Sequence, residues 1–147
     1  MSDEITIRRL RGAFRDVGIV FDEYAEHNGT LFRLKGDSNC DGVSIRVLDD
    51  RLVLWVQDGF LPAPLGEGLS ELYDGFAKQW TNGHPGLSAH LLNPFREEGA
   101  APACKATYPI PSTSVGLKKL LRDKILAIDL KAALGFCREI QEWVKES

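Results

Sequence analysis

Two neighbouring β-type runs, separated by a short acidic turn, constrain this chain more than any other stretch. The runs Gly42–Leu48 and Arg51–Gln57 are rich in branched and aromatic residues, and Asp49-Asp50 lies between them. A two-residue loop there predicts an antiparallel hairpin with six apolar residues on one face: Val43, Ile45, Val47, Leu52, Leu54 and Val56. A slip of one residue would move this set to the other face, so its burial determines the pairing.

The opposite face of this hairpin is mixed in character. It carries Ser44, Arg46, Leu48, Arg51, Val53 and Trp55. If all the helices pack on the first face, the apolar members of this set form an exposed patch, and such patches usually mark an interface. We therefore expect a candidate interface formed by Leu48, Val53 and Trp55, with Tyr108 on a neighbouring strand edge.

An amphipathic helix is predicted before the hairpin, because apolar residues recur there at spacings of three and four: Ile7, Leu10, Phe14 and Val17. Its end is open to two interpretations. The helix either continues to about His27, or it is capped by Gly18 and followed by a strand over Ile19–Glu26. The β propensity of that segment, and the hairpin signal Asn28-Gly29 before Thr30–Lys35, favour the second interpretation. Four consecutive antiparallel strands are then expected.

Helix and strand patterns follow one another in the second half of the chain. A middle helix is predicted from an apolar stripe that ends before Asn82-Gly83: Leu69, Leu72, Tyr73, Phe76 and Trp80. The segments Leu87–Asn93 and Cys104–Ile110 are predicted strands, joined by a loop that contains Pro94, Gly99 and Pro102. Because proline cannot donate to a ladder, Pro109 places the second strand at an edge or presents its nitrogen outward.

The C-terminal region is predicted to be helical, with two successive apolar stripes. The first is Leu117, Leu121, Ile125 and Ile128, and the second is Leu134, Cys137, Ile140 and Trp143 or Val144. Either one long helix or two helices with a joint near Ala127–Leu130 would satisfy this pattern. The expected fold class is α+β: one domain over residues 1–147, with an antiparallel sheet and N-terminal, middle and C-terminal helices in the order α-β(3-4)-α-β-β-α.

The composition bounds the kinds of partner. The chain has 147 residues, 44% hydrophobic and 27% charged, which is ordinary for a globular protein. Its net charge of −3 argues against nucleic acid as an obligate partner. The basic cluster Lys118, Lys119, Arg122 and Lys124 is interpreted as the solvated face of a helix. No apolar run is long enough for a membrane span, and the start Met1-Ser-Asp-Glu is acidic, so a cytoplasmic location is expected.

The loop Gly36–Gly42 matches half of a calcium-binding pattern. Asp37, Asn39 and Asp41 alternate before Gly42, but Leu48 occupies the twelfth position, where a bidentate glutamate should stand. We therefore expect a polar hairpin loop and no response to calcium. The three histidines, His27, His84 and His90, are too far apart in sequence to predict a metal site.

Catalytic and cofactor-binding motifs are not found in the sequence. It lacks a Gly-x-Ser-x-Gly elbow, a phosphate loop, a dinucleotide fingerprint and a Cys-x-x-Cys pair. Cys40, Cys104 and Cys137 are odd in number and widely separated, which suits reduced thiols. No catalytic residue and no cofactor is predicted.

The order of elements resembles the type III secretion chaperone-like fold, particularly the related group described as "putative bacterial sensory-transduction regulators". The resemblance covers the whole chain. It rests on the Leu10-x-x-x-Phe14-x-x-x-Gly18 helix, the Val43–Gln57 hairpin, the helix closing on Trp80-Thr81-Asn82, and the late strand Lys105–Pro111 that leads into a C-terminal helix. The Pro94–Ala103 loop is longer than this pattern. The resemblance implies a small acidic protein, often dimeric, that binds other polypeptides and performs no chemistry.

Three functions are therefore carried forward. The first is a non-enzymatic protein-binding or regulatory domain that is chaperone-like. The second is a small-molecule-binding or enzymatic α+β domain with a pocket between sheet and helices, and the third is an immunity protein. The apolar patch of Leu48, Val53 and Trp55 also predicts a homodimer, because two-fold pairing is the commonest way to cover such a patch, and the resemblance to dimeric chaperones points the same way.

Overall fold

The computed structural model describes residues 2–26, 29–35, 42–48, 50–57, 67–92 and 101–146. The first half contains α1 (Ser2–Asp16), β1 (Val20–Glu26), β2 (Gly29–Lys35), β3 (Val43–Leu48) and β4 (Arg51–Gln57). The second half contains α2 (Glu67–Asn82), β5 (Ser88–Leu92), β6 (Ala101–Pro109), α3 (Ser114–Lys119), the π-helical segment η1 (Leu120–Asp129) and α4 (Leu130–Glu146).

The strands form one six-stranded sheet in the order β1-β2-β3-β4-β6-β5, with every neighbouring pair antiparallel. The predicted α+β class is confirmed. The predicted register of the central hairpin is confirmed as well, and its six inward residues are at most 2% exposed. The pairs are Val43 with Val56, Ile45 with Leu54, and Val47 with Leu52.

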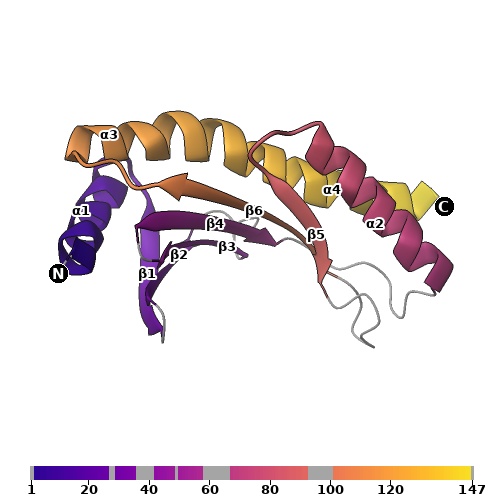
Figure 1. Ribbon diagram of the computed structural model, residues 1–147, viewed down its shortest axis with the longest axis horizontal. Helices are drawn as coiled ribbons and strands as arrows, with labels where there is room; N and C mark the ends of the chain where they lie inside the picture. Colours follow the sequence, from indigo (N-terminus) through magenta and orange to yellow (C-terminus); the bar gives the residue numbers. More distant parts are fainter. Residues whose placement is uncertain are drawn as a thin grey trace.

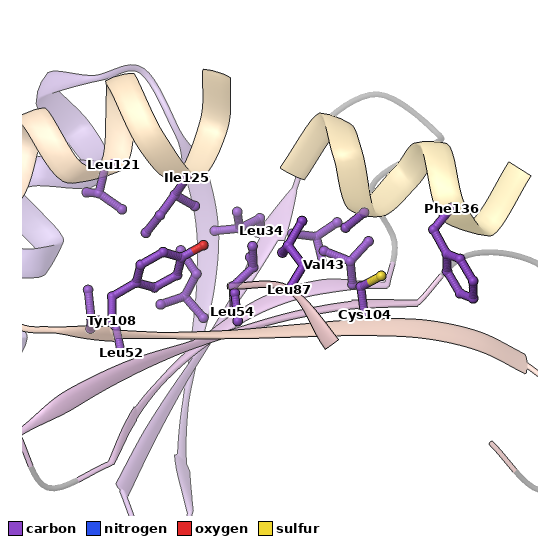
Figure 2. Packing of buried hydrophobic residues seen from close by; sticks show 14 of the residues in the cluster. Leu34, Val43, Leu52, Leu54, Leu87, Cys104, Tyr108, Leu121, Ile125 and Phe136 are labelled. Atoms are coloured by element: carbon purple, nitrogen blue, oxygen red, sulfur yellow. The ribbon is translucent and has the colours of Figure 1, made fainter. Parts of the chain in front are cut away.

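The helices pack on the face of the sheet that carries these residues. Figure 1 shows the long C-terminal helical stretch running along one side of the curved sheet, with α1 near β1 and α2 near β5. Figure 2 shows Leu54, Cys104 and Tyr108 projecting from the sheet toward helical residues that include Leu121 and Phe136. No described helix covers the other face, which we call the open face.

The N-terminal helix ends where the preferred interpretation placed it. Gly18 has a positive φ of 81°, and the Ile19 amide donates to the Phe14 carbonyl at 2.8 Å, a bond typical of a Schellman cap. The chain then enters β1, whose Phe21 packs with Phe14 and Phe32 at ring-centroid distances of 5.2 and 5.4 Å. The helix to His27 is therefore excluded, because residues up to Glu26 pair with β2.

Gly29 makes possible the close packing of β2 against β3. Glu26 pairs with Gly29, so Gly29 is the first residue of β2, and His27 and Asn28 lie outside the described residues. A Cβ atom at Gly29 would collide with the Val47 carbonyl oxygen. The glycine therefore permits the close approach of two strands, and it lies in β2 and not in the turn where the sequence signal Asn28-Gly29 placed it.

The last strand departs from its prediction. β6 begins at Ala101, so Pro102 lies inside a strand and not in the expected loop. The strand is also not at an edge, because β4 pairs with Ala103 to Pro109 and β5 pairs with its first part, Ala101 to Lys105. The Ile110 amide donates to the Asp50 carbonyl of the β3–β4 turn. Because successive backbone N–H groups of a strand point in opposite directions, the Pro109 nitrogen points away from β4. On that side β5 does not reach Pro109, because its first residue, Ser88, pairs with Lys105. The outward nitrogen was the alternative that the sequence left open.

The C-terminal helical stretch is continuous from Ser114 to Glu146, but its winding changes. In η1 the bonds reach five residues back, as from the Leu130 amide to the Ile125 carbonyl. The wider turn makes inward positions recur every four residues, so Asp129 is buried at 4% exposure. Ile128, predicted on the inner stripe, is 54% exposed. The joint expected near Ala127–Leu130 is therefore a change of winding and not a break.

The middle helix also corrects one predicted core residue. Leu72 is 57% exposed, while Tyr73, Ala77 and Trp80 are buried. Trp80 packs on Phe136 of α4 with ring centroids 5.1 Å apart, so α2 joins the same helical layer. The side chains of Leu69, Trp143 and Val144 lie outside those that the structure describes.

Candidate binding face

The open face contains a groove of about 370 Å³ at its centre. Its lining comes from four strands, because alternate residues of each strand point away from the helices. The lining residues are Leu31 of β2, Ser44, Arg46 and Leu48 of β3, Val53 and Trp55 of β4, and Lys105 of β6. The groove therefore combines an aliphatic and aromatic floor with two cationic side chains.

Trp55 lies in the middle of this groove and is half-buried. It pairs with Ser44 on one side and with Lys105 on the other. Its ring is nearly parallel to that of His90, at 16°, with centroids 6.5 Å apart. A large amphipathic ring held between polar neighbours offers contact area and an indole N–H to a ligand.

Three of the four predicted interface residues come together here. Leu48, Val53 and Trp55 all line the groove, although Val53 is only 7% exposed and forms part of its floor. Tyr108 does not join them, because its position in β6 turns the side chain to the helical face. There its hydroxyl donates a hydrogen bond to the Asp129 carboxylate. Burial, and then this bond, raise the pKa of Tyr108 well above its ordinary value.

The sequence interpretation missed Leu31 and Lys105 as lining residues. Leu31 reaches the groove because it pairs with Arg46, and Lys105 because it pairs with Trp55. The alternation within each strand showed which residues share a face of that strand. It contained no signal for the long-range pairing of β4 with β6, which places Lys105 beside Trp55.

The rim of the open face along β1 is acidic but internally paired. Lys35 Nζ lies 3.1 Å from Asp22 Oδ2, and Arg46 Nε lies 2.6 Å from Glu26 Oε1. These side chains are all substantially exposed, so each pair contributes little to stability. These two carboxylates of β1 are therefore neutralised by a lysine of β2 and an arginine of β3.

Charges on the helical side are arranged separately. Arg11 of α1 makes a bidentate bond to Glu23 of β1, and the guanidinium lowers the pKa of that carboxyl. The predicted basic cluster lies on the solvent side of α3 and η1, where Lys118 pairs with Asp16 at 2.6 Å. Its interpretation as a solvated helix face is consistent with the exposed positions of Lys119, Arg122 and Lys124.

A second hollow, of about 400 Å³, lies between α2 and β5. It is lined by polar residues such as Asp74, Lys78 and Asn82. The Thr81 hydroxyl accepts a hydrogen bond from the Ala89 amide at 2.9 Å, which occupies one donor of the β5 edge. This contact blunts the edge against the addition of another strand.

Metal ligands and reactive thiols are not gathered at either hollow. In the part of the chain that the structure describes, no group of three or more His, Cys, Asp or Glu could hold a metal ion. The calcium-like positions Asp37, Asn39 and Asp41, and also His27 and Cys40, lie outside the described residues. Cys104 and Cys137 are buried core thiols, and burial raises the pKa of Cys104 well above its ordinary value.

Membrane insertion of a helix finds no support in the described ranges. None of the helices there combines the length and the apolar character that crossing a bilayer requires.

Comparison with known proteins shows the fold alone. No protein-family model matches the sequence, and no curated protein matches it. Among solved structures, the chain is similar to YbjN, described as "a putative transcription regulator from E. coli", with a TM-score of 0.61 and 14% identity. The similarity covers 88% of this chain and 86% of that one. It confirms the expected fold, and membership of the regulator or secretion-chaperone group stays a prediction.

Proposed function

We propose that this protein is a non-enzymatic regulatory domain that binds a segment of another protein in the groove of the open face. The observation that carries the proposal is the position of Trp55, half-buried at the centre of a groove on a sheet face that no described helix covers. A groove with an aliphatic and aromatic lining and a few polar side chains is the kind of surface on which ligands usually bind.

Binding, and not catalysis, suits the side chains of the groove. Leu31, Leu48 and Val53 offer aliphatic contact area, and Trp55 offers an aromatic anchor of the type enriched at interface hot spots. The groove volume of about 370 Å³ matches a few side chains of a peptide. YbjN, which is similar in fold, is described as a regulator, and this supports a regulatory role by analogy.

A selection from a displayed peptide library tests the proposal. The immobilised protein is the bait, and Trp55→Ala is the counter-bait. We expect peptides that bind the wild-type chain and lose about tenfold or more of their affinity for the variant, because an aromatic anchor is removed. The melting temperature of each variant establishes that it is folded.

A matched control lies outside the groove. Leu72→Ala also removes an exposed apolar side chain, but from α2, and it should leave peptide binding unchanged. If no peptide is enriched, or if the enriched peptides bind Trp55→Ala as well as the wild type, the open face is not the binding surface.

The homodimer expected from the sequence stays a prediction. It would use the same residues, Leu48, Val53 and Trp55, so a second copy and a peptide would compete for one surface.

A further inference from the structure

The open face is cationic, although the whole chain carries a net charge of −3. Strand alternation and register place five cations and two carboxylates there among the described residues. The cations are Arg33, Lys35, Arg46, Arg51 and Lys105, and the carboxylates are Asp22 and Glu26. Positive charge is therefore concentrated on the one sheet face that the described helices leave open.

Both carboxylates of this face are already paired within the sheet. Asp22 lies against Lys35, and Glu26 lies against Arg46. Arg51, at the end of the face, is 4.0 Å from Asp50 in the neighbouring turn. The internal anions therefore lie at the edges and do not neutralise the side of the groove formed by β6.

Lys105 is the cation on that side. It is exposed, it lies beside Trp55 in β4 and Ser88 in β5, and it makes no ion pair with any described residue. A carboxylate of a ligand at this position would gain a charged partner and a nearby hydroxyl donor. Its desolvation cost would be offset by a charge-assisted hydrogen bond.

The apolar part of the groove is next to Lys105 and Trp55, at the neighbouring position of β4 that also points to the open face. Val53 is two residues from Trp55 on β4, a distance of about 7 Å for extended backbone. In a peptide that runs along β4, inward side chains recur at the same spacing. A residue opposite Lys105 and Trp55 would thus be followed, two positions on, by one opposite Val53 and Leu31.

We infer that the groove selects acidic peptide segments in which a residue with a carboxylate side chain is followed, two positions on, by an apolar residue. This inference rests on the proposed function and names the class of its partner. A second copy of the chain is a poorer occupant, because two such faces would bring their cations together. A nucleic acid is also disfavoured, because Lys35, Arg46 and Arg51 already have acidic partners and the whole chain is anionic.

Fluorescence anisotropy with three labelled synthetic peptides tests the inference. The peptides share their leucine positions and carry Glu, Gln or Lys two positions before each leucine. We expect the Glu peptide to bind about tenfold more tightly than the Gln peptide, and added salt to weaken it. Lys105→Glu should reverse the order, so that the Lys peptide binds best.

Lys119→Glu is the matched control, because it makes the same charge change on the helical side of the molecule. It should leave the preference for the Glu peptide intact. Equal binding of all three peptides, lost together in Trp55→Ala, would overturn the acidic preference and leave the proposed function standing. Failure of all three to bind, or tighter binding of a single-stranded oligothymidine, would also overturn it. In that case the display selection still tests the proposed function separately. The amino-acid composition of any peptides that it enriches is an independent measure of the charge preference.

Discussion

At the scale of single residues, the two faces of the central hairpin make opposite demands on their side chains. Ile45 is fully buried beside Leu54, whereas its neighbour Ser44 lines the open groove. A change of one position along β3 therefore separates a residue that holds the fold from one that meets a ligand. Stability and binding can be altered independently on this strand.

Ile45→Ala or Leu54→Ala should lower the free energy of unfolding by about 2–4 kcal/mol, because each leaves a cavity in a well-packed core. Arg46→Ala should cost about 1 kcal/mol or less, because its ion pair with Glu26 is exposed. Urea unfolding of the three variants measures both effects. Equal losses on the two faces would contradict the register.

Tyr108 makes stability depend on alkaline pH. Its pKa is raised in the folded protein, so above pH 10.0, the ordinary tyrosine value, the unfolded chain releases a proton that the folded chain retains. Stability is therefore fully present below that value and falls as the pH rises beyond it. Unfolding measured on either side of pH 10.0 should show a steeper loss for the wild type than for Tyr108→Phe. Parallel losses would show that Tyr108 does not contribute.

At the scale of elements, the π-helical segment η1 is the feature that most needs support. Its winding places Asp129 where an apolar residue would otherwise face the sheet, and leaves Ile128 in solvent. The buried carboxylate is matched by the Tyr108 hydroxyl and by Lys124 Nζ at 3.3 Å. We interpret the Tyr108 contact as the tertiary support for the wider turns, and the Lys124 contact as support within η1 itself.

A double-mutant cycle tests that support. Tyr108→Phe and Asp129→Leu should each cost about 1–3 kcal/mol, because the first removes one of the two partners of the buried Asp129 carboxylate and the second leaves the buried Tyr108 hydroxyl without its acceptor. The double variant should cost less than the sum of the two, because no buried polar group of this pair is left. Chemical unfolding gives the three values. Strict additivity would mean that the contact does not couple β6 to η1.

At the scale of the whole molecule, the helices and the charges divide between the two faces of one sheet. The helical layer buries the apolar face of the strands, and the open face combines an apolar groove with an excess of cations. Association through the open face is therefore opposed by like charge when the partner is another copy, and assisted when the partner is acidic.

Sedimentation equilibrium at tens of micromolar tests self-association. Because salt screens like charges, any dimer formed through the open face should strengthen as salt is added, whereas acidic-peptide binding should weaken. Trp55→Glu should be a folded 16.3 kDa monomer at every salt concentration. A dimer that persists in this variant would place the contact elsewhere.

The sequence by itself determined the elements whose signals are local. Alternation and a two-residue turn determined the β3–β4 register, and a glycine able to adopt positive φ determined where α1 ends. Only the tertiary structure decided that Tyr108 faces the helices, that η1 brings Asp129 inward, and that Lys105 lies beside Trp55. These outcomes depend on β4 pairing with β6 and on the C-terminal helices packing across the sheet. Residues so far apart in sequence leave no periodic signal of their contact, so the groove could be predicted only in part, through Leu48, Val53 and Trp55.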